Sequence, residues 1–235
     1  MTWLAWRQHR AQALVVAAML ALAAAALAVQ RMATAGLSPQ GDPNGGLNTL
    51  AVLEIVAMML VPGLLGLFLG APLVARELET GTHRLAWAQS ISRTRWLLLA
   101  VAVVLGIGLG AAAASSALVS WALAPWVALQ QKVGNPGWFN SGTFDAVGVV
   151  PVAYALFALA LGIASGAVLR RTLLAMFVVL VLFTAVRIPI AVAARPNYEP
   201  PARIITNALS DLDPGQLDRS GAWVVGINMI DPQGQ

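Results

Sequence analysis

The sequence lacks cysteine entirely and contains only two histidines, His9 and His83. Without thiols there is no disulfide, no thiolate metal site and no cysteine nucleophile, and two histidines leave little material for zinc or haem. Charged residues are also scarce, at 10% of the chain, whereas a soluble globular domain has about 25%. So few charges cannot coat a water-soluble particle of 235 residues.

Motifs for nucleotide binding and catalysis are missing as well. The sequence has no G-x-x-x-x-G-K-[ST] phosphate loop, no His-Glu-x-x-His zinc motif and no serine nucleophile elbow. The glycines at positions 106, 108 and 110 lie in an apolar run, which does not suit a nucleotide loop. We therefore expect no catalytic, cofactor-binding or metal site in this chain, and no ATP hydrolysis by it.

Apolar residues dominate what is present: they make up 59% of the chain, and the mean hydropathy is +0.76. A helix that crosses a bilayer needs roughly 20 mostly apolar residues. Because the first apolar run is long and lacks a small-residue cleavage site, we interpret it as a retained span and not as a signal peptide. The sequence predicts an all-α polytopic membrane protein, a single transmembrane domain with five spans at about 12–29, 49–75, 96–123, 147–169 and 172–194.

The charges divide unequally between the predicted connections. With the N-terminus in the cytoplasm, the inner segments are short and rich in arginine, whereas the outer loops and the external tail, 195–235, are long and hold most of the acids, Asp145 among them. Such a bias sets the orientation of membrane proteins. The pI near 10.6 therefore reflects topology, and we expect no nucleic-acid partner.

The predicted inner link, residues 76–95, contains the most distinctive polar sequence. A charged turn follows Ala75, Gly81 breaks it, and Thr82–Gln89 can form a short surface helix before Ser92 caps the next span. Such a helix suits contact with a soluble partner. From the residues alone, a solvated connector is an equally good interpretation.

The order Ala75-Arg76-Glu77-Leu78-Glu79-Thr80-Gly81-Thr82, then Leu85 and Ser90-Ile91-Ser92-Arg93, resembles a loop of type-2 ABC exporter permeases, especially actinobacterial ones. In that family the loop between spans two and three holds a coupling helix that docks on a separate ATPase subunit. The resemblance implies a bacterial plasma-membrane permease that pairs with a second permease subunit, while its partner ATPase binds ATP and Mg²⁺. Docking would fall on Glu77, Glu79, Gly81, Thr82, Arg84 and Leu85.

The N-terminus adds a looser resemblance. The segment Thr2–Arg10 is similar to the family's interfacial elbow helix, and its Trp3, Trp6, Arg7 and Arg10 suit a membrane surface. The family usually has six spans and this sequence predicts five, so we expect a sixth span beyond the sequence given. Residues 195–235 then correspond to the long external segment of the family.

Two charged residues lie inside predicted spans, Glu54 in the second and Arg187 in the fifth. Ionisable groups within a membrane are costly and mark functional sites by default. They are candidates for an intramembrane polar site, either as a pair or as the lining of a polar cavity. Equally, Glu54 could reach the outer headgroups and Arg187 could snorkel.

The leading hypothesis is a permease subunit of an ATP-driven exporter. One alternative is a membrane enzyme acting on lipids or peptides, although Glu54 and Arg187 alone are a thin basis for catalysis. Another is a membrane anchor or sensor that uses its external tail. The sequence leaves the substrate open, and the direction of transport comes only from the resemblance.

Overall fold

The computed structural model describes residues 2–34, 46–81, 93–132 and 141–191, and all regular structure in these ranges is helical. Five of the helical segments are long and apolar enough to cross a membrane. This confirms the predicted all-α polytopic fold. The elements are α1 (Thr2–Thr34), α2 (Gly46–Leu65), the π-helix η1 (Gly66–Gly70), α3 (Ala71–Thr80), α5 (Arg93–Lys132), α6 (Ser141–Ala146), α7 (Val150–Leu169) and α8 (Thr172–Pro189).

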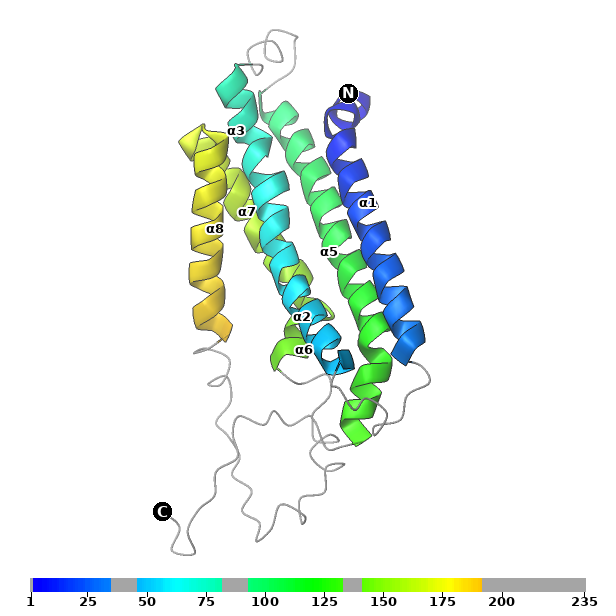
Figure 1. Ribbon diagram of the computed structural model, residues 1–235. Helices are drawn as coiled ribbons and strands as arrows, with labels where there is room; N and C mark the ends of the chain where they lie inside the picture. Colours follow the sequence, from blue (N-terminus) through cyan, green and yellow to red (C-terminus); the bar gives the residue numbers. More distant parts are fainter. Residues whose placement is uncertain (1, 35–45, 82–92, 133–140, 192–235) are drawn as a thin grey trace, which may run out of the picture.

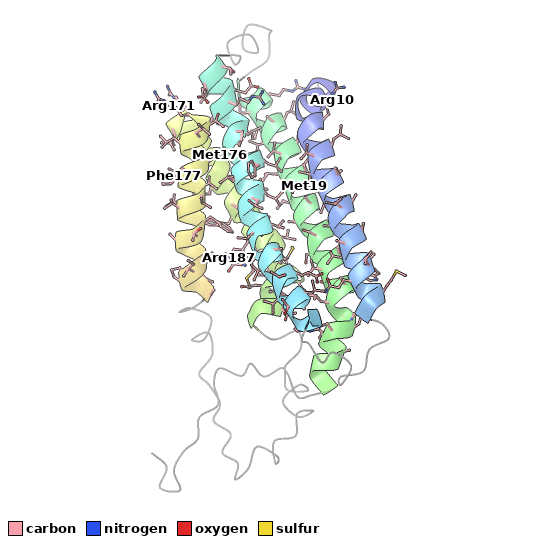
Figure 2. All side chains as sticks on the ribbon, in the orientation of Figure 1. Arg10, Met19, Arg171, Met176, Phe177 and Arg187 are labelled. Atoms are coloured by element: carbon pink, nitrogen blue, oxygen red, sulfur yellow. The ribbon has the colours of Figure 1, made fainter. Side chains whose placement is uncertain are left out.

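The helices form an elongated bundle in which α1 lies beside α5 and α8 occupies the opposite edge (Figure 1). The segments α2, η1 and α3 follow one another as a single rod, with α7 packed against it. The start of α1, the end of α3 and the link between α7 and α8 lie at one end, and Figure 2 shows Arg10 and Arg171 there. We call this the basic end. The short helix α6 lies toward the other end, the distal end.

Several element boundaries differ from the prediction. The second span was expected to end at Ala75, but the helix continues to Thr80 and stops at Gly81, whose φ of +73° ends it in the left-handed region. The third span was expected to end near residue 123, yet α5 continues through Pro125 to Lys132. Residues 141–146 were assigned to a loop and instead form α6.

The N-terminal segment is helical, as expected, but it is not separated from the first span. The single helix α1 runs without a break from Thr2 to Thr34. The reason is in the sequence, because these 33 residues contain neither glycine nor proline to interrupt the helix. The central part of the predicted coupling loop, 82–92, and the external tail lie outside the described residues.

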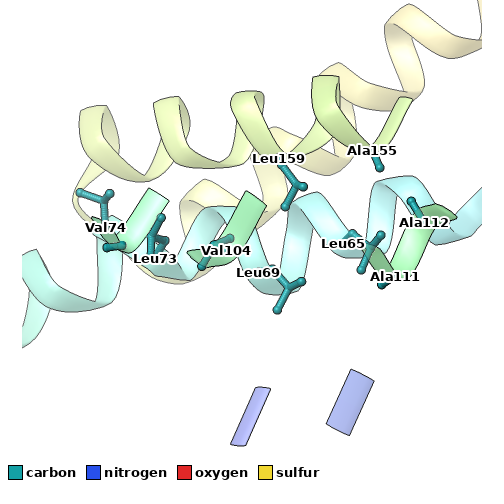
Figure 3. Packing of buried hydrophobic residues seen from close by; sticks show 10 residues of the cluster. Leu65, Leu69, Leu73, Val74, Val104, Ala111, Ala112, Ala155 and Leu159 are labelled. Carbon is teal, nitrogen blue, oxygen red and sulfur yellow. The ribbon is translucent and has the colours of Figure 1, made fainter. Parts of the chain in front are cut away.

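Glycine brings α7 into backbone contact with the α2–η1–α3 rod. A Cβ atom placed on Gly162 would lie 2.5 Å from the carbonyl oxygen of Gly66, and one on Gly166 would lie 2.5 Å from that of Ala71. Small residues allow membrane helices to approach this closely, and dispersion then holds them together. Leu159 projects from α7 into the same core, where Gly108 of α5 gives it room (Figure 3).

A contact with α1 accounts for the uninterrupted course of α5 through Pro125. Proline has no N–H, so the carbonyl of Trp121, four residues earlier, loses its helical donor. Arg31, at the end of α1, donates a hydrogen bond to that carbonyl. Its guanidinium also lies 4.5 Å from the centre of the Trp121 ring. The arginine thus replaces the missing backbone donor and joins α1 to α5.

We predict that Gly162→Ala lowers the free energy of unfolding by about 1–3 kcal/mol, because the new methyl group meets backbone atoms that cannot move aside. The matched control is Gly106→Ala, since a Cβ atom there has no neighbour within 4 Å. In this control the free energy of unfolding should stay unchanged or rise by at most about 1 kcal/mol, because alanine favours a helix more than glycine does. Titration with SDS in mixed micelles measures both. Equal effects of the two substitutions would contradict this account of the packing.

We predict that Arg31→Ala lowers the free energy of unfolding by about 2 kcal/mol, through loss of a charge-assisted hydrogen bond and a cation–π contact. Pro125→Ala restores the backbone donor to Trp121. In the Pro125→Ala background, the loss of unfolding free energy caused by Arg31→Ala should be smaller by roughly 1 kcal/mol. A double-mutant cycle in mixed micelles measures this difference, and strict additivity of the two substitutions would refute the donor-replacement role.

Candidate functional site

The basic end of the bundle contains a polar link between two helices that are distant in sequence. Oε2 of Glu79, in the last turn of α3, accepts a hydrogen bond of 3.1 Å from the backbone N–H of Thr172. The same oxygen accepts a second bond of 2.7 Å from the Thr172 hydroxyl. Thr172 is the first residue of α8, so this carboxylate caps the beginning of α8 from another helix.

The capping has a clear electrostatic basis. The first N–H groups of a helix have no partner inside the helix, and the positive end of its dipole favours an anion. The preceding residue, Arg171, is extended and provides no side-chain cap. Glu79, which follows the apolar part of the rod, caps α8 instead. Its two hydrogen bonds from Thr172 lower the pKa of its carboxyl group below the usual value. The carboxylate is exposed at the end of α3.

The remaining predicted docking residues divide into two groups. Glu77 lies with Glu79 in the last part of α3, and Gly81 ends the helix. Both lie at the basic end, from which the chain enters the predicted coupling loop (Figure 1). Thr82, Arg84 and Leu85 lie outside the described residues, and the docking role of all six residues stays a prediction.

A second polar cluster lies within the bundle, on the distal side of its glycine contacts. Arg187 of α8 pairs with Asp145 of α6, with 3.7 Å between Nη2 and Oδ2. Both are largely buried, with side chains 13% and 2% exposed. The guanidinium also lies 4.2 Å from the centre of the Tyr154 ring on α7. The label in Figure 2 marks the position of Arg187 on α8. The cluster therefore joins three helices.

Arg187 therefore pairs with Asp145, whereas a pair with Glu54 was one of the possibilities that the sequence left open. Glu54 is half-buried on α2, and its Oε2 has no hydrogen-bond partner among the described residues. The sequence analysis missed Asp145 because it assigned this residue to an exposed acidic loop. A useful signal was available, since a buried arginine requires an anionic partner and Asp145 lies only a few residues before the fourth span.

The described residues contain no group of three or more His, Asp or Glu side chains that could hold a metal ion. The polar groups instead occur as pairs that connect helices: Glu79 with Thr172 at one end, and Asp145 with Arg187 toward the other. This arrangement can transmit or resist relative movement of the helices. It defines a helical membrane protein in which polar pairs add links between helices that pack through apolar cores.

Comparison with known families identifies the class. The family model described as ABC-2 membrane transporter related matches residues 2–195, and the chain belongs to this family. It is thus a multi-pass membrane component of a transporter, and this family is not a catalytic one. Comparisons with curated proteins and with solved structures give no match.

We predict that Asp145→Asn lowers the free energy of unfolding by about 3 kcal/mol, because it leaves Arg187 buried without a counter-charge. The double substitution Asp145→Leu with Arg187→Met removes both charges and should recover at least half of the loss. SDS titration in mixed micelles tests both variants. An unchanged single mutant would show that the pair contributes nothing to stability.

Proposed function

We propose that the chain is the transmembrane permease subunit of an ATP-driven exporter, with ATP hydrolysis carried out by a separate ATPase subunit that holds ATP and Mg²⁺. The observation that carries this proposal is the family match over residues 2–195. That match includes the whole loop whose sequence resembles a coupling helix. Proteins of this family generally work with an ABC ATPase.

The placement of the loop supports the same assignment. Both helices that flank it, α3 and α5, have an end at the basic end of the bundle (Figure 1). The N-terminus of α1 and the Arg170–Arg171 link lie at that end too. Arginine enrichment is typical of the cytoplasmic side of bacterial membrane proteins, where an ATPase has access to ATP. We therefore assign the basic end, with the N-terminus, to the cytoplasm.

The proposed mechanism needs no chemistry in this chain. Two permease subunits associate in the plasma membrane, and each contacts an ATPase through residues 76–95. Closure of the ATPases on ATP moves the coupling loops, and the attached helices rearrange to release substrate outward. The alternatives, a membrane enzyme and a sensor, have no specific support from the two polar pairs.

We predict that Arg84→Ala with Leu85→Ala reduces co-purification of the ATPase subunit about tenfold or more, because truncating an anchoring contact commonly costs at least 1.4 kcal/mol. The measurement is affinity purification of the full-length chain from membranes, followed by an ATPase assay. Arg10→Ala, with its exposed side chain on α1, is the matched basic control. Equal recovery from both variants would refute docking through the loop.

If the unmodified full-length chain recovers no ATP-hydrolysing protein from membranes in which it is expressed with its neighbouring reading frames, the whole assignment fails. Recovery of an ATPase with the unmodified chain but not with the double mutant supports it. This comparison separates the existence of the partner from the position of its docking site.

A further inference from the structure

The resemblance assigns Glu79 to the surface that docks the ATPase, but the structure gives its carboxylate an intramolecular partner. Both hydrogen bonds from Thr172 converge on Oε2, and 93 residues separate the two positions in sequence. Glu79 also lies two residues before Gly81, where α3 ends and the coupling loop begins. The side chain thus links the end of α3, where the loop begins, to the start of α8.

We propose that Glu79 is a positioning residue whose carboxylate makes the α7–α8 hairpin follow the coupling loop. This inference rests on the proposed function, because an ATPase must move the loop for the link to transmit anything. It differs from the expectation drawn from the resemblance, in which Glu79 contacts the ATPase directly.

The hairpin is built to move as one piece. Two residues, Arg170 and Arg171, connect α7 to α8. The N–H of Arg170 donates to the carbonyl of Gly166, and Arg170 has a φ of +53°, which is uncommon for a residue other than glycine. Such a short connection in a fixed conformation gives the two helices little freedom to separate at this end. A force applied to the first turn of α8 therefore reaches α7 as well.

The rod and the hairpin are also packed together near the link. Ala71 and Ala75 of α3 form a buried cluster with Ala175 and Val179 of α8. Apolar contacts of this kind are non-directional and permit sliding, whereas the bonds from Glu79 fix the axial register of α3 against α8. The carboxylate consequently adds a directional link between the end of α3 and the start of α8 to the packed contacts between α7 and the rod.

Substitutions at Glu79 and Thr172 can distinguish whether Glu79 acts as a hydrogen-bond acceptor for α8 or as a charge that contacts the ATPase. Glu79→Gln keeps an amide oxygen that can accept both bonds, whereas Glu79→Ala removes the acceptor. Thr172→Val removes the hydroxyl donor and Thr172→Ser retains one. Thr172 lies outside the 76–95 loop, so direct docking through Glu79 predicts no effect at this position. The matched control is Thr184→Val, because Thr184 is exposed on the same helix.

The readout is the distance between the distal ends of α1 and α8 in the purified complex with its ATPase. The chain contains no cysteine, so Met32→Cys and Ile188→Cys give two unique labelling sites, both on exposed side chains. Double electron–electron resonance with and without ATP and vanadate measures the shift. ATPase co-purification is quantified for every variant, so loss of docking is detected separately.

We expect the parent, Glu79→Gln, Thr172→Ser and Thr184→Val to show the ATP-dependent shift. Glu79→Ala and Thr172→Val should lose most of it while retaining ATPase co-purification within about twofold. If Thr172→Val keeps the full shift, or if Glu79→Ala and Glu79→Gln both lose ATPase co-purification, the positioning role is overturned.

A second measurement tests the link without the partner. In a double-mutant cycle of Glu79→Ala with Thr172→Val, the unfolding equilibrium constant in mixed micelles should show a coupling of about tenfold. Additive effects would overturn the link itself. If no ATPase co-purifies with the unmodified chain, the proposed function and the transmission role fail together, and the cycle still decides whether the hydrogen-bonded link exists.

Discussion

Lipid offers no hydrogen bonds, and this constraint governs the whole structure. Inside a bilayer each backbone N–H and C=O needs a partner within the protein, and helices satisfy nearly all of them internally. The exceptions are at prolines, at helix ends and at the turns between helices. At one place of each kind in this bundle, a polar side chain from another element supplies the missing partner.

The three places show the same solution with different residues. Arg31 donates to the carbonyl that Pro125 leaves without a helical donor. Glu79 accepts from the free N–H at the start of α8. The Ser116 hydroxyl donates to the carbonyl of Gly148, in the turn that precedes α7, at 2.9 Å. Because each of these bonds joins different helices or their connections, satisfying the backbone also fixes the tertiary arrangement.

The number and approximate positions of the spans could be predicted from the sequence because they depend on length and apolarity, which are local properties. The ends of the helices could not. Pro125 is a breaker by local rules, and only the distant Arg31 explains why α5 continues. The extension of α3 to Thr80 likewise exceeds what bilayer thickness requires, and it brings Glu79 within reach of Thr172.

The sequence indicated that Arg187 and Glu79 matter, but it did not reveal which residues they contact. Arg187 was recognised as an intramembrane charge, and a buried charge needs a counter-ion to offset its lost hydration. Its partner Asp145 is on α6, which was predicted to be a loop, because a helix of six residues has no detectable apolar period. For Glu79 the resemblance indicated a role at the coupling loop. Its hydrogen bonds depend on the α7–α8 link, which no local pattern around Glu79 reveals.

The position of the tightest packing gives the two ends of the bundle different mechanical roles. At Gly162 and Gly166 the backbone of α7 touches the α2–η1–α3 rod, and close-packed contacts of this kind resist gradual deformation. In the proposed mechanism, motion that enters at the basic end is therefore more easily accommodated by rigid displacement of rod and hairpin together than by bending between them. Such a displacement carries Arg187 with α8 and loads its pair with Asp145. The 3.7 Å separation of that pair exceeds hydrogen-bonding distance, yet separating it would leave two buried charges without a counter-charge, so the pair resists displacement of α8 at the distal end.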